Sequence, residues 1–256
     1  MTACLEVRGL SRHFGGLTAV RDLSFTVPDG AITGLIGPNG SGKTVTFDCI
    51  TGFYRPSSGR VLFRGEDVTG QRPHEIALHG IGRSFQLTGV FPRLTVEENL
   101  AFAAQEKRFL RTLAGFTRRA DAAAPAEVAR VLDFLNLGEA RHERVASLPY
   151  GQQRILELGS LMLMQPEPAL YMLDEPFAGL AQGEVTRYVA LLRQMRGTGK
   201  TFLIVEHNVR AIMNVCDTIV VLDHGEKIAA GTPADIQSDA RVIEAYLGHA
   251  TAPQRH

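Results

Sequence analysis

The sequence predicts an α/β fold, with a mostly parallel sheet covered by helices and an inserted helical subdomain. After Gly151, strand-like and helix-like segments alternate, which is typical of βαβ units in a parallel sheet. From about Thr95 to Ser147, strand signals fade and Ala, Arg, Glu and Leu dominate, which indicates helices. We expect a single domain whose core comprises residues 1–94 and 165–256, with residues 95–164 as the helical subdomain.

The composition is that of an ordinary soluble globular protein. Of 256 residues, 45% are hydrophobic and 21% are charged, and Lys plus Arg balance Asp plus Glu at 27 each. This balance provides no basic field for nucleic acid, so no nucleic acid is expected as a partner. The three cysteines, Cys4, Cys49 and Cys216, form neither a CxxC pair nor a zinc spacing, which favours a reducing cytosol. Since the sequence has neither a signal-peptide core nor an apolar run of roughly 18 residues, a partner must supply any membrane span.

The first part of the chain contains short strand candidates separated by turns. Alternating or β-branched apolar residues mark the strands, and Pro28, Asp29 and Gly30 mark a turn. The strand candidates are LEVRGL, LSFTV, AITGLIG and VLFRGEDV, the last of them with a turn. We expect one helix from Lys43 to about Thr51 and a short helix over PHEIALHG.

The later part of the chain is expected to alternate between strands and helices. The strand candidates are ALYML, TFLIV, TIVVLD and the late strand EKIAAG. The helix candidates are GEVTRYVALLRQM, VRAIMNVC and the closing helix DARVIEAYLG. This order is the basis for the parallel sheet predicted above.

The segment GPNGSGKT follows the strand AITGLI and opens a helix, which is the context expected of a phosphate-binding loop. Its residues are Gly37, Pro38, Asn39, Gly40, Ser41, Gly42, Lys43 and Thr44. Glycines let backbone N–H groups surround phosphates, and the helix N-terminus adds a partial positive charge. We expect Lys43 to reach the β- and γ-phosphates and the Thr44 hydroxyl to bind Mg²⁺. The alternative, an ordinary glycine-rich turn, is weaker because both flanks fit.

The segment ALYMLDEP predicts an apolar strand that ends in Asp174 and Glu175. An Asp at the carboxyl end of a buried parallel strand can hold Mg²⁺ opposite the phosphate loop. Glu175 is then placed to polarise an attacking water. Alone, the pair is more simply two carboxylates beside the turn at Pro176, but after a phosphate loop the catalytic interpretation is favoured.

In their joint order, the motifs of this chain resemble those of ATP-binding cassette (ABC) ATPases across nearly its whole length. They are, in chain order, Phe14 in RHFGG, GPNGSGKT, Gln86 in GRSFQ, LPYGQQR, LDEP and His207 in LIVEHN. Each match except the phosphate loop is short, and their order makes the resemblance specific. The resemblance implies a phosphate-loop NTPase core with an N-terminal antiparallel β-subdomain, ATP as the substrate and Mg²⁺ as the metal.

The same resemblance assigns roles to single residues. Phe14 looks like the aromatic residue that stacks on adenine. Gln86 looks like the residue that joins the attacking water and Mg²⁺, whose other ligands are Thr44 and Asp174, to the partner-facing groove. His207 looks like the residue that contacts the γ-phosphate and braces the catalytic carboxylate. Taken singly, each of these is more simply a core, loop or structural residue.

The stretch LPYGQQR stands where the family usually has LSGGQ, whose helix faces the ATP of the opposite subunit in a dimer. Pro149 replaces the serine and lacks both a hydroxyl and an N–H group. Tyr150 replaces the first glycine, while Gly151 and Gln152 remain. The helix dipole can still attract phosphate, so we expect a working but weakened signature. A helix start without a ligand is the alternative.

A narrower resemblance indicates the ATPase subunit of branched-chain amino acid uptake systems. It rests on FGGLTAV, GIGRSFQ, YGQQR, VEHN and VIEAYLG. It implies a second, different ATP-binding subunit, two transmembrane permease subunits and an extracytoplasmic solute-binding protein. It also implies a peripheral position on the cytoplasmic face of the inner membrane. The solute is chosen by the partners, and related systems carry urea, amides or other amino acids.

The basic segment Glu106–Ala120 combines cationic and apolar residues at helical spacing. It is interpreted as a packed helix with a solvated cationic face, in preference to a contact with a membrane partner or anionic lipid.

Other functions fit the sequence less well. An ABC ATPase that serves lipid export, nucleic acid or ribosomes is the main alternative, but the chain has one phosphate loop, no zinc pairs and a neutral net charge. A GTPase or small-molecule kinase lacks support because the chain has no NKxD motif. A purely regulatory binding module is disfavoured by the complete set of Lys43, Asp174, Glu175 and His207.

Overall fold

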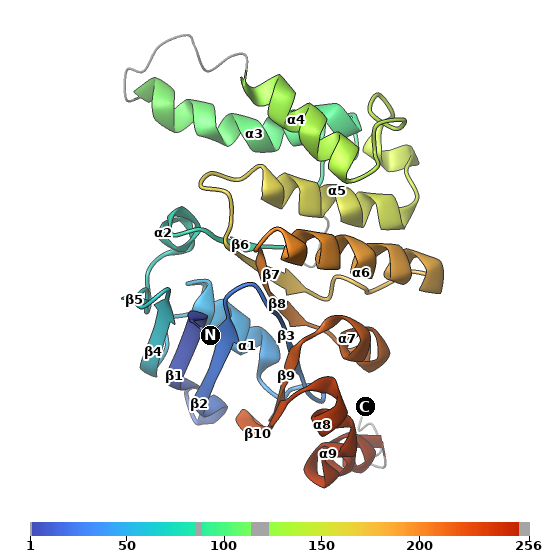
Figure 1. Ribbon diagram of the computed structural model, residues 1–256. Coiled ribbons are helices and arrows are strands. Elements are labelled where there is room, and N and C mark those ends of the chain that lie inside the picture. The colour runs from blue at the N-terminus through green and yellow to red at the C-terminus, as the bar shows by residue number, and fades with distance from the viewer. Residues whose placement is uncertain (1, 85–88, 114–122, 251–256) are drawn as a thin grey trace.

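The computed structural model describes residues 2–84, 89–113 and 123–250. It confirms the predicted α/β fold, with two sheets in one part of the molecule and a group of helices at the top in Figure 1. Within the described ranges, no helix has both the length and the apolar character needed to cross a membrane.

The N-terminal strands form an antiparallel sheet in the order β2-β1-β4-β5. Its strands are β1 (Ala3–Phe14), β2 (Leu17–Pro28), β4 (Ser58–Phe63) and β5 (Glu66–Asp67). Along β2, Leu23, Phe25 and Val27 are buried, while Ser24 and Thr26 between them are exposed. This period of two places one face of the sheet on the core and leaves the other in water. The expected antiparallel β-subdomain is therefore confirmed.

The second sheet has the order β10-β9-β3-β8-β7-β6 and is parallel except for its edge strand β10. Its strands are β3 (Ile32–Ile36), β6 (Ile81–Arg83), β7 (Leu170–Asp174), β8 (Thr201–Val205), β9 (Thr218–Asp223) and β10 (Glu226–Gly231). Every residue of β3, β7 and β8 is buried. Burial on both faces explains why these strands read as continuous apolar runs.

Helices cover both faces of the parallel sheet (Figure 1). The helix α1 (Lys43–Ile50) confirms the helix expected after the phosphate loop, and its Phe47 and Ile50 share a core with Leu5 of β1 and Leu35 of β3. The other helices around the sheets are α2 (Pro73–Leu78), α6 (Gln182–Gly197), α7 (Val209–Val215), α8 (Pro233–Ser238) and α9 (Ala240–Ala250). The larger core joins α6, α7 and α9 to the opposite face of the parallel sheet.

The short helix α8 was not predicted from the sequence. Its start nevertheless carries a recognisable signal, because Thr232 accepts a hydrogen bond from the Asp235 amide at 3.3 Å and Asp235 Oδ2 accepts one from the Thr232 amide at 2.9 Å. This is the reciprocal capping box, and Pro233 occupies the first helical position. The apolar pattern of so short a helix is too brief to be detected by periodicity.

The helical part of the molecule consists of α3 (Val96–Leu113), α4 (Ala123–Phe134) and α5 (Tyr150–Met162). A second capping box starts α3, in which the Thr95 hydroxyl accepts from the Glu98 amide at 3.1 Å and Glu98 Oε2 accepts from the Thr95 amide at 2.7 Å. A Cβ at Gly159 would lie 2.4 Å from Leu135 Cδ1, so this glycine lets α5 pack closely.

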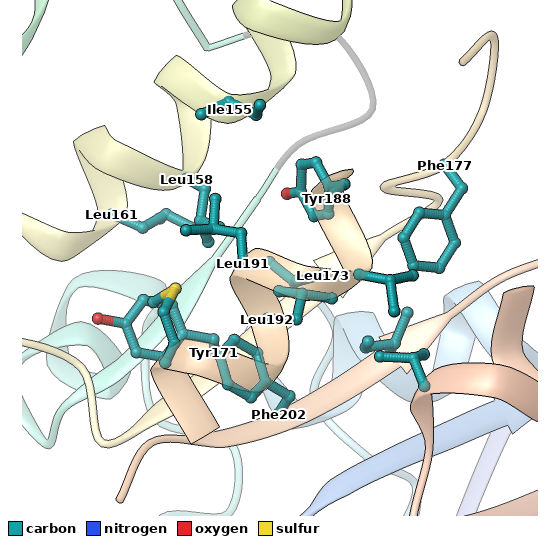
Figure 2. Close-up of a cluster of buried hydrophobic side chains, with 14 of the residues drawn as sticks. Ile155, Leu158, Leu161, Tyr171, Leu173, Phe177, Tyr188, Leu191, Leu192 and Phe202 are labelled. Atoms are coloured by element: carbon teal, nitrogen blue, oxygen red, sulfur yellow. The ribbon is translucent and has the colours of Figure 1, made fainter. Parts of the chain in front are cut away.

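The core continues without interruption from α5 through α6 to the parallel sheet. Figure 2 shows Leu158 and Leu161 of α5 beside Leu191 of α6, with Tyr171 and Phe202 of the sheet below them. The rings of Tyr171 and Phe202 stack with their centroids 5.2 Å apart. A displacement of α5 therefore cannot occur without repacking its contacts to the strands that carry the predicted catalytic residues.

Candidate active site

The segment Gly37–Thr44 comprises the loop that follows β3 and the first two residues of α1. A Cβ at Gly37 would lie 2.1 Å from the Leu222 carbonyl oxygen, and one at Gly42 would lie 2.5 Å from the Ala19 carbonyl oxygen. Both glycines have a positive φ, 154° and 96°. No larger residue fits at either position, so the glycines of this motif are required by the backbone that surrounds the loop.

Lys43 lies inside this loop and is only 4% exposed. Its Nζ donates hydrogen bonds to the carbonyl oxygens of Gly37 at 2.8 Å and Pro38 at 2.9 Å. Burial lowers the pKa of Lys43, and the charges of Glu175 and Asp174 oppose this shift. The ammonium group is thus held at the centre of the loop, where anionic oxygens can replace the two carbonyls.

The start of α1 offers further groups to an anion. The helix has no side-chain cap and no acidic residue in its first turn. The Ser41 hydroxyl is buried and has no hydrogen-bond partner among the described residues, and Thr44 is exposed. An uncapped helix N-terminus next to an orphaned hydroxyl favours a phosphate group as the missing partner.

Asp174 ends β7 and is 2% exposed. Its Oδ2 accepts a hydrogen bond from Arg83 at 3.3 Å, and its amide donates to the Ser84 hydroxyl at 3.1 Å. In the described part of the chain its Oδ1 is buried without a hydrogen-bond partner, and burial raises the pKa of this carboxyl. An orphaned carboxylate oxygen is the kind of group that Mg²⁺ binds, so Asp174 and the exposed hydroxyl of Thr44 fit the predicted metal.

Glu175 and His207 contact each other directly. His207 Nε2 lies 3.0 Å from Glu175 Oε1, and both side chains are partly exposed. Glu175 has a φ of 48°, a left-handed conformation that is uncommon outside glycine. Its amide donates to the Val205 carbonyl at 2.8 Å, which ties it to the end of β8. The structure thus joins the two residues that the sequence pattern predicted as the water-polarising base and its brace.

Glu206 was not identified from the sequence as a site residue. It is 2% exposed, and its Oε1 accepts from the Phe177 amide at 2.8 Å. Its Oε2 accepts from the amides of His207 at 2.7 Å and Asn208 at 2.8 Å. A carboxylate with three amide donors is well compensated for its burial. Glu206 therefore fixes the loops that carry Glu175 and His207, and its position directly after the apolar run TFLIV was the available signal.

Phe14 lies at the end of β1, on the antiparallel sheet. Its ring meets the Tyr54 ring edge-on at 5.2 Å, and the Arg12 guanidinium lies 4.4 Å from its centroid. Tyr54 and Arg12 were not identified from the sequence. Arg12 covers part of the Phe14 ring, and the ring remains 36% exposed, so it still offers surface to a base.

The signature residues surround the start of α5. Pro149 is the N-cap and makes no side-chain cap, and Tyr150 is exposed at the first helical position. The Gly151 amide donates to Glu184 Oε1 of α6 at 3.2 Å, and a Cβ at Gly151 would lie 2.4 Å from that oxygen. Gln152 follows on the same turn of α5, with its amide bonded to the Pro149 carbonyl at 2.9 Å.

Two predictions lie outside the described residues. Gln86 belongs to residues 85–88, and the side chains of the basic segment 106–120 belong to residues 105–124. Their predicted roles remain predictions.

The chain matches known families over most of its length. Residues 20–178 match the family described as ABC transporter, and residues 226–252 match the family described as branched-chain amino acid ATP-binding cassette transporter.

Relatives that match over nearly the full length of the chain agree with these family matches. The chain is 39% identical to the high-affinity branched-chain amino acid transport ATP-binding protein BraF of Pseudomonas aeruginosa, over 96% of this chain and 98% of that protein. It is 38% identical to LivG of Escherichia coli, with the same shares covered, and 32% identical to the lipopolysaccharide export ATP-binding protein LptB of Haemophilus influenzae, over 95% and 97%. A solved ADP conformation of MJ1267, an ATP-binding cassette of an ABC transporter, is similar with a TM-score of 0.84 and 30% identity, over 97% of this chain and 100% of that chain.

Proposed function

This chain belongs to the ABC transporter family, and from that premise we propose that it binds and hydrolyses ATP to power a membrane importer for branched-chain or related amino acids. The observation that carries the proposal is the convergence of Lys43, Asp174, Glu175 and His207 beside one phosphate loop. The match of residues 226–252 to the branched-chain cassette family supports the solute class.

ATP binding would use groups that are already in position. The Lys43 ammonium would exchange its two carbonyl acceptors for β- and γ-phosphate oxygens, and the N-terminus of α1 would stabilise their charge. Thr44, Asp174 and, by resemblance, Gln86 would hold Mg²⁺, which supplies positive charge against the phosphates. Phe14 would stack on the adenine ring.

Hydrolysis would use Glu175 as the group that accepts a proton from water. The water oxygen then bonds to the γ-phosphorus, the bond from that phosphorus to the ADP oxygen breaks, and Lys43 stabilises the charge that develops on the phosphates. His207, which lies 3.0 Å from the carboxylate, would keep Glu175 in place and contact the γ-phosphate.

The signature at the start of α5 would complete the site of a second ATP-binding subunit. Tyr150, Gly151 and Gln152 would face the ATP of that partner, so each site of the pair would need residues from both chains. The narrower resemblance favours a partner that differs from this chain, and therefore a heterodimer.

Such an importer has two permease subunits, and this chain would bind one of them through an apolar groove of about 370 Å³. It is lined by residues of α2, α3 and α5 and by the exposed rings of Phe53, Phe91 and Phe102. Exposed aromatic rings beside an apolar groove are typical of a protein interface. We assign to this groove a short apolar segment of a permease, which would hold the chain on the cytoplasmic face of the inner membrane, with a solute-binding protein acting outside.

Export is the second candidate, because the chain is also 32% identical to the export protein LptB. The C-terminal match over residues 226–252 favours uptake. Purification of the chain from native membranes in mild detergent, with its bound proteins identified, distinguishes uptake from export. We expect permeases and a different ATPase to co-purify with the chain, and a solute-binding protein to be encoded near their genes. Co-purification of export components or ribosomes would contradict the proposed importer.

The variant Glu175→Gln tests the hydrolytic site. We expect ATP binding to persist and turnover of the assembled complex to fall by about 100-fold or more, since an amide cannot accept the proton from water. Calorimetry measures the binding, and release of phosphate measures the turnover. Turnover at the wild-type rate would mean that another group is the base.

A further inference from the structure

The helix α5 carries a buried ion pair that the mechanism above does not use. Arg154 is 3% exposed and Glu157 is 7% exposed, and Arg154 Nη1 lies 3.1 Å from Glu157 Oε2. Burying two charges is costly, and an apolar pair of similar size often stabilises a protein equally well or better. The pair therefore calls for an explanation other than stability.

Arg154 also reaches the catalytic residue. Its Nη2 donates a hydrogen bond to the Glu175 carbonyl oxygen at 3.4 Å. Its guanidinium lies 5.4 Å from the centroid of the Tyr150 ring, in the signature. One side chain thus touches the signature, the buried carboxylate of Glu157 and the backbone of Glu175.

The backbone of Glu175 needs such support. Its φ of 48° lies in a region that residues with a Cβ rarely adopt, so the surrounding structure must hold it there. The Val205 carbonyl binds the Glu175 amide at 2.8 Å, and Arg154 binds the Glu175 carbonyl. Loss of the arginine would release one side of this residue and let its carboxylate shift from the attacking water.

Glu157 connects this support to the groove assigned above to a permease. It lines the groove together with Ser160 and Leu161 of the same helix. A permease segment in the groove would therefore press on the helix turn that orients Arg154, while Leu158 packs against α6 (Figure 2).

We infer that Arg154, oriented by Glu157, is a positioning residue for Glu175 and links the wall of the apolar groove to the catalytic carboxylate. The inference rests on the proposed function, because it concerns the same hydrolytic site. A merely structural ion pair would affect folding and leave the rate of the chemical step unchanged.

The double variant Arg154→Met/Glu157→Leu tests the inference in the complex of the chain with its native partners. It replaces the ion pair with apolar side chains of similar volume, so we expect an unchanged or higher Tm. ATP affinity should stay within about twofold of wild type because the phosphate loop is untouched, while kcat should fall by about tenfold or more. Arg154→Lys, which keeps a cationic donor, should retain more of kcat than the double variant.

The matched control replaces another ion pair in the same way. Arg141 and Glu97 form a more exposed ion pair at the start of α3, outside the site, and Arg141→Met/Glu97→Leu should leave kcat unchanged. If the Arg154 double variant fails to fold, Arg154→Gln/Glu157→Gln replaces it under the same criteria, since two amides can keep a neutral hydrogen bond on this turn.

The outcomes separate the inference from the proposed function. A folded double variant with wild-type kcat overturns the positioning role while the ATPase stands. A fall in ATP affinity equal to the fall in kcat also overturns it, because the pair would then support the site as a whole. If the wild-type complex shows no ATP hydrolysis that Glu175→Gln removes, the proposed function fails and the inference fails with it.

Discussion

At the scale of single residues, the site gathers polar groups that are costly to bury. Lys43, Asp174 and Glu206 are all nearly inaccessible to water. Glu206 has three amide partners, whereas Asp174 Oδ1 and the Ser41 hydroxyl have no hydrogen-bond partner within the ranges that the structure describes. Leaving a buried polar atom unpaired costs on the order of 1–3 kcal/mol, so a ligand that pairs with both atoms should stabilise the folded chain.

Replacing Lys43 with alanine tests the central cation. The variant should lose ATP affinity by about 100-fold or more, because the charge that pairs with the phosphates is removed from the loop. Isothermal titration calorimetry measures the affinity.

The matched control is Lys227→Ala, since Lys227 also donates to a backbone carbonyl, that of Ser24 at 2.6 Å, but lies on β10. Its ATP affinity should equal that of wild type. If Lys43→Ala binds ATP as tightly as this control, the phosphate-loop assignment is wrong.

Residues with local motifs could be predicted from the sequence, and residues with only long-range contacts could not. Lys43 and Glu175 belong to short patterns whose spacing has a chemical reason. Arg154 and Tyr54 acquire their roles from neighbours that are distant in the chain, Glu175 and Phe14. A single sequence does not reveal such pairs, because the motifs identify Glu175 and Phe14 but do not show which distant side chains contact them.

At the scale of elements, α5 is the helix whose start departs most from the family pattern. Pro149 gives the helix no side-chain cap, and the Gly151 amide is taken by Glu184. Both features weaken the attraction of this helix end for an external phosphate, since one donor is missing and a carboxylate already occupies another.

The variant Pro149→Ser should repair this helix start. The serine hydroxyl can cap α5, worth about 1 kcal/mol, and can donate to the ATP of the partner subunit. We expect a higher Tm for the isolated chain and faster ATP turnover in the assembled pair.

Arg72→Ser is the control, because Arg72 is the N-cap residue of α2, its side chain makes no cap hydrogen bond, and it lies away from the signature. It should raise Tm in the same way without a change in turnover. Equal turnover for Pro149→Ser and wild type would favour the alternative in which α5 starts without a ligand.

The helices and strands could be predicted from the sequence wherever their hydrophobic pattern was long enough to show a period. The strands β7, β8 and β9 and the helices α1 and α6 were predicted at nearly their observed places. The direction of β10 was not predicted, although the connection from β9 to β10 consists of only His224 and Gly225. Because so short a connection can join only antiparallel strands, this loop was the available signal. The helix α8 was missed because six residues are too few to show a helical period.

At the scale of the whole molecule, the apolar groove presents exposed aromatic rings to a partner. Phe91 and Phe102 meet edge-on with centroids 4.8 Å apart, and Phe102 is 50% exposed. The groove lies between the helical part and the sheets, so an occupant would contact both.

The variant Phe102→Asp should abolish assembly with the permeases, because it places a charge in the apolar groove. ATP affinity of the isolated chain should be unchanged. Co-purification from membranes measures the assembly, and calorimetry measures the affinity.

Ile243→Asp provides the control, since Ile243 is similarly exposed on α9, outside the groove. It should assemble as wild type does. Loss of assembly in both variants, or in neither, would contradict the assignment of this groove.

The close packing of the phosphate loop has a consequence for biosynthesis. The carbonyls of Ala19 and Leu222 press on Gly42 and Gly37, so residues from both ends of the chain enclose the loop. While Leu222 is still inside the ribosome, the nascent chain lacks one wall of its phosphate loop. We therefore expect ATP binding to be acquired only near the end of translation, and a chain that stalls before β9 should be unable to bind or to consume ATP.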